Sequence, residues 1–356
     1  MVFGTDQVIK QQQGEGNLIV VMSQGASSDE LENVKEHLSK RGLKVHMSEG
    51  IERTVVGVIG QIYPELQSEL ELMDGVGEVV RISKPYKLAS KEFKSDDTVI
   101  SIGEAGVKIG GGEFVVFGGP CAIEGEDQVM ETAKAVKKSG ATVLRGGAFK
   151  PRTSPYSFRG MAEDGLKLMD LARKETGLPL ITEVMSERDV ELVAKYTDVL
   201  QVGARNMQNF ALLDEVGKTS KPVMVKRGFS ATYEDWLLAA EYVMAGGNKS
   251  VILCERGIRT FETSTRNTMD LNAIPVIKQL RHLPIVSDPS HGTGKWDYVT
   301  PLACASVAAG ADGLIIEVHP RPETAWSDGA QSLTLENFDA LMSKVRAIRS
   351  ALSDQP

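Results

Sequence analysis

Four side chains of metal-binding type are spread over the chain, and each follows an apolar run. Cys121 lies in Gly-Gly-Pro-Cys, His291 in Asp-Pro-Ser-His and Asp328 in Ser-Asp-Gly, while Glu317 ends an apolar run. A thiolate, an imidazole and two carboxylates together suit a first-row divalent metal ion. These donors do not choose among manganese, iron, cobalt and zinc. No CxxC motif supports the site, and each residue has an ordinary alternative in the core or on the surface.

A second group of residues is basic or hydroxylic. Each member stands at or soon after the end of a predicted strand: Arg145, Lys150, Arg152, Thr153, Ser154, Arg205, Lys226, Arg227 and Arg256. Any one of them could be a solvated surface residue. Their shared position at strand ends instead predicts a binding site. Because guanidinium and ammonium groups match phosphate and carboxylate oxygens, the predicted ligand is small and polyanionic.

Eight short apolar runs, each followed by a crossover, must position these residues. The predicted strands are 114–118, 142–146, 179–184, 198–202, 222–226, 249–253, 284–287 and 313–318. This alternation predicts an α/β fold, a (β/α)8 TIM barrel over residues 98–356, whose site lies at the carboxyl ends of the strands. A doubly wound sheet is the competing arrangement. We also expect a hairpin that joins 107–110 to 113–117 through three glycines.

A smaller unit precedes the barrel at residues 17–83. Its predicted order is βαββαβ, the ferredoxin-like arrangement of a small α+β domain. Ser27 and Glu30 have the spacing of a capping box at the start of its first helix. Residues 84–97 are rich in charge and begin with Lys84-Pro85, so they are predicted to be a solvated linker.

Composition excludes several classes of protein. The chain has 356 residues and a net charge of −8, with a pI of about 5.4, so a nucleic-acid partner is not expected. No apolar run approaches the roughly 18 residues that a membrane span needs, and residues 1–17 lack the apolar core of a signal peptide. The three cysteines are far apart. We therefore expect a reduced, cytoplasmic enzyme without a membrane partner.

Six motifs in order resemble 3-deoxy-D-arabino-heptulosonate-7-phosphate (DAHP) synthases. They are Gly119-Pro120-Cys121, the run from Leu144 to Ser154, Gly203-Ala204-Arg205-Asn206, Val225-Lys226-Arg227-Gly228, Leu253 to Gly257 and Asp288-Pro289-Ser290-His291. The resemblance covers about residues 98–350, and the front unit resembles the regulatory ferredoxin-like module of one subfamily. No chorismate mutase segment is apparent. The family condenses phosphoenolpyruvate with erythrose 4-phosphate, the first step of the shikimate route to aromatic amino acids.

This resemblance implies a role for each site residue. The metal ligands would be Cys121, His291, Glu317 and Asp328. The residues that bind phosphoenolpyruvate would be Arg145, Lys150, Arg205, Lys226 and Arg256, with Glu183 nearby. The aldose phosphate would contact Arg152, Thr153 and Ser154, and Asp288 would lie near the aldose hydroxyls. Lys150 is also placed by its motif to donate a proton.

The resemblance further implies regulation by an aromatic amino acid bound between paired front domains of a homo-oligomer, most simply a homotetramer. His46 and Ser48 match a His-x-Ser stretch of the inhibitor site, and the Ser48 hydroxyl favours tyrosine over phenylalanine. The other interpretation is that both are polar residues at the end of a strand. The sequence itself identifies neither the inhibitor nor the oligomeric state.

Three other functions compete with this one. A 3-deoxy-D-manno-octulosonate 8-phosphate synthase runs the same condensation on arabinose 5-phosphate, but its aldose loop reads Lys-Ala-Asn-Arg-Ser where this chain has Lys150-Pro151-Arg152-Thr153-Ser154. A Schiff-base aldolase would use Lys226 as its nucleophile. A non-catalytic amino-acid sensor would need only the front domain and neither the cations nor the metal ligands.

Overall fold

The computed structural model describes residues 15–49, 54–63, 65–81, 86–91, 93–150 and 156–353. The chain divides into two compact units, Met1–Pro85 and Tyr86–Pro356. Within the described residues, no helix is both long enough and apolar enough to cross a membrane.

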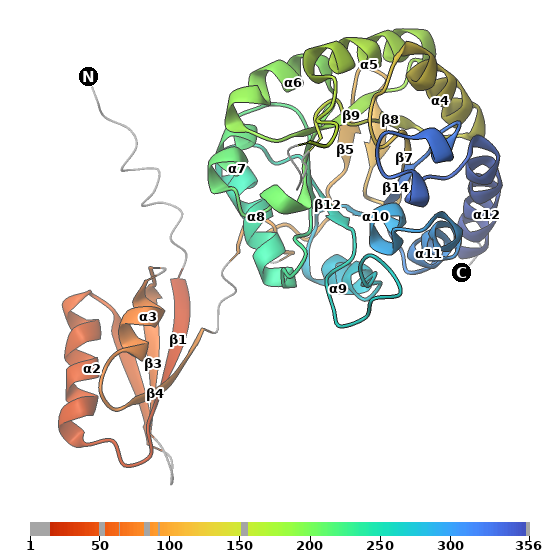
Figure 1. The fold of residues 1–356 in the computed structure, drawn as a ribbon. Coiled ribbons are helices and arrows are strands. Elements are labelled where there is room, and N and C mark those ends of the chain that lie inside the picture. Colours follow the sequence, from red (N-terminus) through yellow and green to blue (C-terminus); the bar gives the residue numbers. More distant parts are fainter. Residues whose placement is uncertain are drawn as a thin grey trace, which may run out of the picture. The chain divides into compact units, whose positions relative to one another are not determined.

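The described residues of the first unit form an antiparallel sheet with helices α2 and α3 against it (Figure 1). Its elements are β1 (Glu15–Met22), α2 (Ser28–Lys40), β2 (Lys44–Glu49), β3 (Thr54–Gln61), α3 (Leu66–Glu71) and β4 (Val76–Arg81). The strand order β2-β3-β1-β4 confirms the predicted ferredoxin-like arrangement. Alternate residues of β1, Leu18, Val20 and Met22, are buried with Val34 and Leu38 of α2, as expected for a sheet with one face on a core.

Helix α2 begins as its sequence predicts. The Glu30 N–H donates to Ser27 Oγ over 3.2 Å, and the Ser27 N–H donates to Glu30 Oε2 over 2.6 Å. These two bonds form the capping box and satisfy two N–H groups that the helix leaves without a partner.

The second unit is a closed barrel of eight parallel strands surrounded by helices (Figure 1). Its strands are β7 (Val115–Gly119), β8 (Val143–Arg145), β9 (Leu180–Val184), β10 (Val199–Val202), β11 (Val223–Lys226), β12 (Val251–Glu255), β13 (Ile285–Ser287) and β14 (Gly313–Glu317). Nearly every strand residue is buried, because helices cover the outer surface and side chains fill the interior. Closure between β14 and β7 confirms the predicted barrel and excludes the doubly wound sheet.

Helices cover the outside of the barrel. They are α4 (Glu126–Ser139), α5 (Ala162–Thr176), α6 (Val190–Tyr196), α7 (Phe210–Gly217), α8 (Tyr233–Ala245), α9 (Ala273–Leu280), α11 (Trp296–Ala308) and α12 (Leu335–Ser353). The short helix α10 (Pro289–Thr293) instead follows β13 directly, at the carboxyl end of the strands (Figure 1). Short 3-10 turns add η1 (Glu187–Asp189), η2 (Ala204–Asn206), η3 (Pro322–Thr324) and η4 (Gly329–Gln331). The turns η2, η3 and η4 lie in loops that follow β10 and β14, where a barrel builds its site.

The first strand of the predicted hairpin pairs with a different segment. Strand β6 (Val107–Ile109) pairs with β5 (Ile100–Ile102), and the described residues keep only a single bridge of the predicted hairpin, between Gly110 and Glu113. Strand β7 pairs with β14 on one edge and with β8 on the other, so closure leaves it no free edge for a hairpin. The β5–β6 hairpin instead buries Ile100, Ile102 and Ile109 in one cluster with residues of the barrel strands.

The expected solvated linker needs correction at residues 86–91, whereas residues 93–97 are exposed as predicted. Tyr86, Ala89 and Ser90 are buried. Three consecutive N–H groups, those of residues 87–89, donate to the carboxylate of Glu241 on α8 over 3.0, 2.8 and 3.1 Å. Charge-rich composition predicted exposure, but it gave no sign of these backbone donors, which hold residues 86–91 against the barrel unit.

Candidate active site

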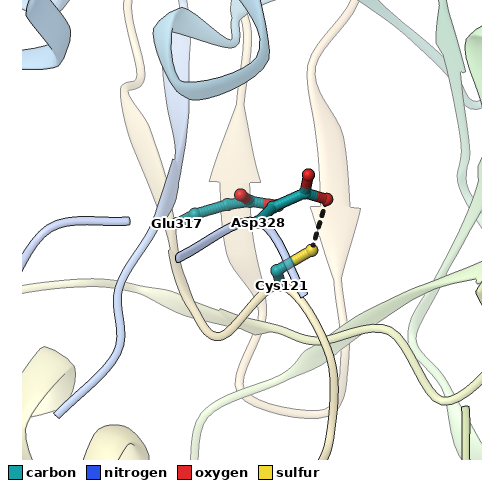
Figure 2. Close-up of side chains that lie close together, drawn as sticks. All are labelled: Cys121, Glu317 and Asp328. Carbon is teal, nitrogen blue, oxygen red and sulfur yellow. Dashed lines mark hydrogen bonds between the residues drawn. The ribbon is translucent and has the colours of Figure 1, made fainter. Parts of the chain in front are cut away.

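A cluster of possible metal ligands lies at the carboxyl end of the barrel strands. Cys121 follows β7, Glu317 ends β14, and Asp328 lies in the loop after β14 (Figure 2). One ligand atom from each of the three residues lies within 4.8 Å of the others. Cys121 Sγ donates to Asp328 Oδ2 over 3.1 Å. The fold therefore brings together three of the four residues that the sequence placed in one site.

His291 lies at the edge of this cluster. Its Nε2 is 3.5 Å from Glu317 Oε1, and its Nδ1 is 2.8 Å from Asp288 Oδ2. Asp288 caps helix α10 by accepting the His291 N–H on Oδ1 over 3.0 Å. Burial lowers the pKa of His291 although the Asp288 and Glu317 carboxylates oppose that shift. A metal ion binds the neutral form of the imidazole.

Burial also controls the charge of the other ligands. It raises the pKa of Cys121 to about 12, and the nearby Glu317 charge adds to this shift. Asp328 is partly buried, which opposes ionisation, but the charge of a protonated His291 and the hydrogen bond from Cys121 hold the pKa of Asp328 well below its usual value. The thiol proton would have to leave when a cation binds. The mixture of sulfur, nitrogen and oxygen donors fits a first-row divalent ion.

Residues that the sequence did not single out hold the two carboxylates. Glu317 Oε2 accepts the Gln331 amide over 2.6 Å, and Gln331 Oε1 accepts Arg266 Nη1 over 2.8 Å. Arg266 Nη1 also lies 3.2 Å from Asp328 Oδ1. Asp328 itself has a φ of 53°, a left-handed backbone conformation that an aspartate adopts only with support. Gln331 and Arg266 lie in none of the motifs, so the sequence gave no signal of these contacts.

Several predicted cations reach the same mouth of the barrel. Arg145 Nη1 lies 3.0 Å from Glu317 Oε1. Lys150 Nζ lies 2.9 Å from Cys121 Sγ, and Lys226 Nζ lies 2.5 Å from Asp288 Oδ2. All three cations are buried, so they can act on a ligand from inside the barrel.

The other predicted residues have different surroundings. Arg205 and Arg256 lie over the ring of Phe229. Arg227 is not a free cation, because it bonds to the carboxylates of Glu255 and Asp270. Arg152, Thr153 and Ser154 lie outside the described residues.

Glu183 of β9 accepts the Gln201 amide over 3.4 Å. It also explains the glycine at position 203, where a Cβ would lie 2.1 Å from Glu183 Oε1. The Gly203 position therefore leaves the Glu183 carboxylate its space at the mouth.

In the front unit, His46 is exposed on β2. Ser48 is on the same strand, paired through its backbone with Val55. Strand β2 is an edge strand of the sheet. The inhibitor role of His46 and Ser48 stays a prediction.

The fold and the mouth together define a (β/α)8 enzyme that acts on small anionic molecules. The family model of the DAHP synthetase I family matches residues 90–353, and that of the DAHP synthase ferredoxin-like domain matches residues 18–84. The chain therefore belongs to the DAHP synthetase I family, and the resemblance seen in its motifs is confirmed.

Individual relatives agree with this membership. The phospho-2-dehydro-3-deoxyheptonate aldolase of Thermotoga maritima is 49% identical over 94% of this chain and 98% of its own length. Its crystal structure superposes with a TM-score of 0.92 at 48% identity, covering 95% of this chain and 98% of that one. A 2-dehydro-3-deoxyphosphooctonate aldolase of Syntrophobacter fumaroxidans is more distant, 33% identical over 70% of this chain and 92% of its own length.

Proposed function

We propose that this chain condenses phosphoenolpyruvate, erythrose 4-phosphate and water to 3-deoxy-D-arabino-heptulosonate 7-phosphate and phosphate. One observation carries the proposal: the similarity to the Thermotoga maritima deoxyheptonate aldolase runs through 94% of this chain at 49% identity. The octulosonate alternative has support from more distant relatives, such as the one at 33% identity over 70% of the chain. With both substrates present, ³¹P NMR should show one phosphate and one heptulosonate 7-phosphate formed for each phosphoenolpyruvate consumed.

The residues at the mouth suggest how the substrates are held. Arg145, Lys226 and Arg256 would bind the phosphate and carboxylate of phosphoenolpyruvate, together with Arg205 and Lys150. Fixing both anionic ends orients carbon 3 of the enol toward the aldehyde and removes much of the entropic barrier. Carbon 3 then attacks the aldehyde carbon, water adds at carbon 2, and phosphate leaves by cleavage of its C–O bond. The same cations stabilise the departing phosphate.

Lys150 is the proposed proton donor. Burial lowers the pKa of Lys150, but the charges of the ionised Cys121 thiolate and of the Glu317 carboxylate outweigh burial and raise it. The ammonium therefore keeps its proton until the alkoxide oxygen of the former aldehyde forms. A divalent ion bound by Cys121, His291, Glu317 and Asp328 would supply Lewis acidity toward that aldehyde.

A Schiff base on Lys226 has less support. Lys226 Nζ and Asp288 Oδ2 form a buried ion pair at 2.5 Å. A nucleophilic lysine needs a free amine, whereas an ion-paired ammonium suits a phosphate contact.

Different substitutions should affect the kinetic constants of the two substrates. We expect Arg256→Ala and Lys226→Ala to lower kcat/KM for phosphoenolpyruvate by about 10- to 150-fold, because a charge-assisted contact is worth about 1.5–3 kcal/mol. Arg152→Ala should instead raise the KM for erythrose 4-phosphate. Steady-state kinetics with each substrate varied in turn measures both effects. Equal changes for both substrates in all three variants would refute the division.

The front unit is proposed to be regulatory, with an aromatic amino acid as effector and tyrosine favoured over phenylalanine through Ser48. This proposal includes a homotetramer in which the front domains pair. Three features support it: a complete sheet-and-helix unit of its own, the match of residues 18–84 to the DAHP synthase ferredoxin-like domain, and the His-x-Ser stretch on the exposed edge strand β2. Allosteric inhibition needs a coupling free energy of only about 1–3 kcal/mol.

Deletion of residues 1–83 tests this regulatory role. The remaining chain should stay active, because the barrel unit contains all the proposed catalytic residues. A truncated form of the Thermotoga maritima synthase, which matches 75% of this chain with a TM-score of 0.71, suggests that such a barrel folds alone. Inhibition curves with tyrosine and phenylalanine should become flat. Inhibition that survives the deletion would place the effector site in the barrel. A His46→Ala/Ser48→Ala double variant of the full chain tests whether these two residues of β2 belong to the effector site, in which case inhibition should weaken.

A further inference from the structure

The cations at the barrel mouth fall into two classes. In the first, a carboxylate lies against the cation: Arg145 with Glu317 at 3.0 Å, Lys226 with Asp288 at 2.5 Å, and Arg227 with Glu255 at 2.9 Å. Such pairing is what burial of a charge ordinarily requires. These cations are held in place by the protein itself.

The second class is a set of three arginines around one aromatic ring, which we call the Phe229 cluster: Arg205, Arg256, Arg259 and Phe229. The guanidinium carbons lie 5.5, 4.8 and 4.7 Å from the ring centroid, respectively. Within the part of the chain that the structure describes, none of the three has a carboxylate partner. The one side-chain hydrogen bond among them runs from Arg256 Nη1 to the Gly257 carbonyl over 3.3 Å.

Phe229 holds these arginines by its ring and by its backbone. A ring face attracts a cation through its quadrupole, so one ring can keep several guanidiniums near each other despite their repulsion. The Arg259 N–H donates to the Phe229 carbonyl over 2.7 Å, which ties the loop after β12 to the loop after β11. The cluster is therefore a built arrangement and not three independent surface residues.

The cluster runs from solvent into the barrel. Arg259 and Arg205 are exposed, whereas Arg256 is only 3% exposed. Arg205, Phe229 and Arg259 line one hollow with Gly228 and Ser230, and its volume is about 420 Å³. That size is within the range of small-molecule pockets. In a chain with a net charge of −8, the Arg205 and Arg259 guanidiniums on this hollow, with Arg256 against the same ring, form a local positive site that attracts anions.

We propose that Arg259 is a further anion-binding residue, which captures the phosphate group of phosphoenolpyruvate at the rim before Arg205 and Arg256 receive it, and that Phe229 is the positioning residue of this path. The inference rests on the proposed function, because it takes its ligand from that reaction. Arg259 lies outside the set of residues that the motifs assigned to phosphoenolpyruvate, and Phe229 has no charge of its own.

Arg259→Gln in the full-length, metal-loaded chain tests the capture role. Removing one steering charge should lower kcat/KM for phosphoenolpyruvate about 10-fold, change kcat less than twofold and leave the KM for erythrose 4-phosphate unchanged. The decline of kcat/KM with added salt should also become shallower. Arg321→Gln is the matched control, since Arg321 is an exposed arginine of the loop after β14 that is paired with Glu131; it should change neither quantity. Unchanged kcat/KM and salt dependence in Arg259→Gln would overturn the proposal.

Phe229→Leu tests the positioning role, with Phe229→Tyr as the conservative variant. Direct binding of phosphoenolpyruvate, measured by calorimetry without the aldose, should weaken about 10-fold or more in Phe229→Leu and return in Phe229→Tyr, because only tyrosine restores the ring. A leucine variant that melts at a lower temperature but binds phosphoenolpyruvate normally would mean that Phe229 only packs.

The binding assay needs no turnover. If the unsubstituted chain binds phosphoenolpyruvate but does not condense it with erythrose 4-phosphate, the proposed function is refuted and the role of the Phe229 cluster is not. If the chain catalyses the condensation but the Arg259 and Phe229 variants bind phosphoenolpyruvate as the unsubstituted chain does, only the role of the cluster is refuted.

Discussion

Cys121→Ala should lower kcat/KM by roughly 10³-fold or more while the chain stays folded. The Sγ atom is one of three ligand atoms that gather within 4.8 Å at the strand ends. Lewis-acid stabilisation is worth several kcal/mol, and about 1.4 kcal/mol corresponds to a tenfold change in rate. The substitution removes a small side chain, so the free energy of unfolding should fall by only about 1 kcal/mol. Kinetics, metal analysis of the purified variant and thermal unfolding measure the three quantities.

Cys304→Ala provides the matched control for this variant. Cys304 lies on helix α11 and is only partly buried, away from the strand ends. It should keep both full activity and full metal content. If Cys121→Ala retained the activity and metal content of the control, the proposed metal site would be wrong.

Lys150→Met should lower kcat by about 10²- to 10⁴-fold, the range that general acid catalysis contributes. Lys150 Nζ lies 2.9 Å from Cys121 Sγ and 3.0 Å from the Cys121 carbonyl, so it stands beside the proposed site of the aldehyde. Rates at saturating concentrations of both substrates measure this effect. Phosphoenolpyruvate binding, measured separately, should weaken by a smaller factor because other cations remain.

Lys150→Arg separates charge from proton donation. The guanidinium keeps the positive charge but does not release its proton, so this variant should bind phosphoenolpyruvate nearly normally and turn over slowly. If Lys150→Met and Lys150→Arg both bound phosphoenolpyruvate weakly but kept the normal kcat, Lys150 would serve in binding alone.

The fold could be predicted because each barrel strand is a short apolar run followed by a crossover. Parallel strands that are covered on both faces need such runs, and the chemistry of a barrel follows at their ends. Cys121, Glu317 and Asp328 could thus be placed in one site before any geometry was known. The hairpin prediction was wrong beyond the bridge between Gly110 and Glu113, because the periodicity of 107–117 describes strands but not their partners. Only closure of the barrel occupied both edges of β7.

Partner choice also limits what the sequence reveals about the site. The sequence predicts Arg227 to be one more phosphate contact, but in the structure its guanidinium lies 2.9 Å from Glu255 and 2.8 Å from Asp270. Gln331 has no signal in the sequence, although its amide bonds to the Glu317 carboxylate. Phe229 resembles any half-buried aromatic residue until three guanidiniums are found around it. Each of these contacts joins separate strands or loops, and local patterns contain no information on such distances.

Phosphate release from phosphoenolpyruvate, followed with erythrose 4-phosphate or arabinose 5-phosphate in the presence and absence of a chelator, tests the central claim most directly. The proposed function predicts rapid release with erythrose 4-phosphate, little with arabinose 5-phosphate, loss of the reaction on chelation and recovery when a divalent ion is added back. Faster release with arabinose 5-phosphate, or full activity in a preparation shown to contain no metal, would contradict it.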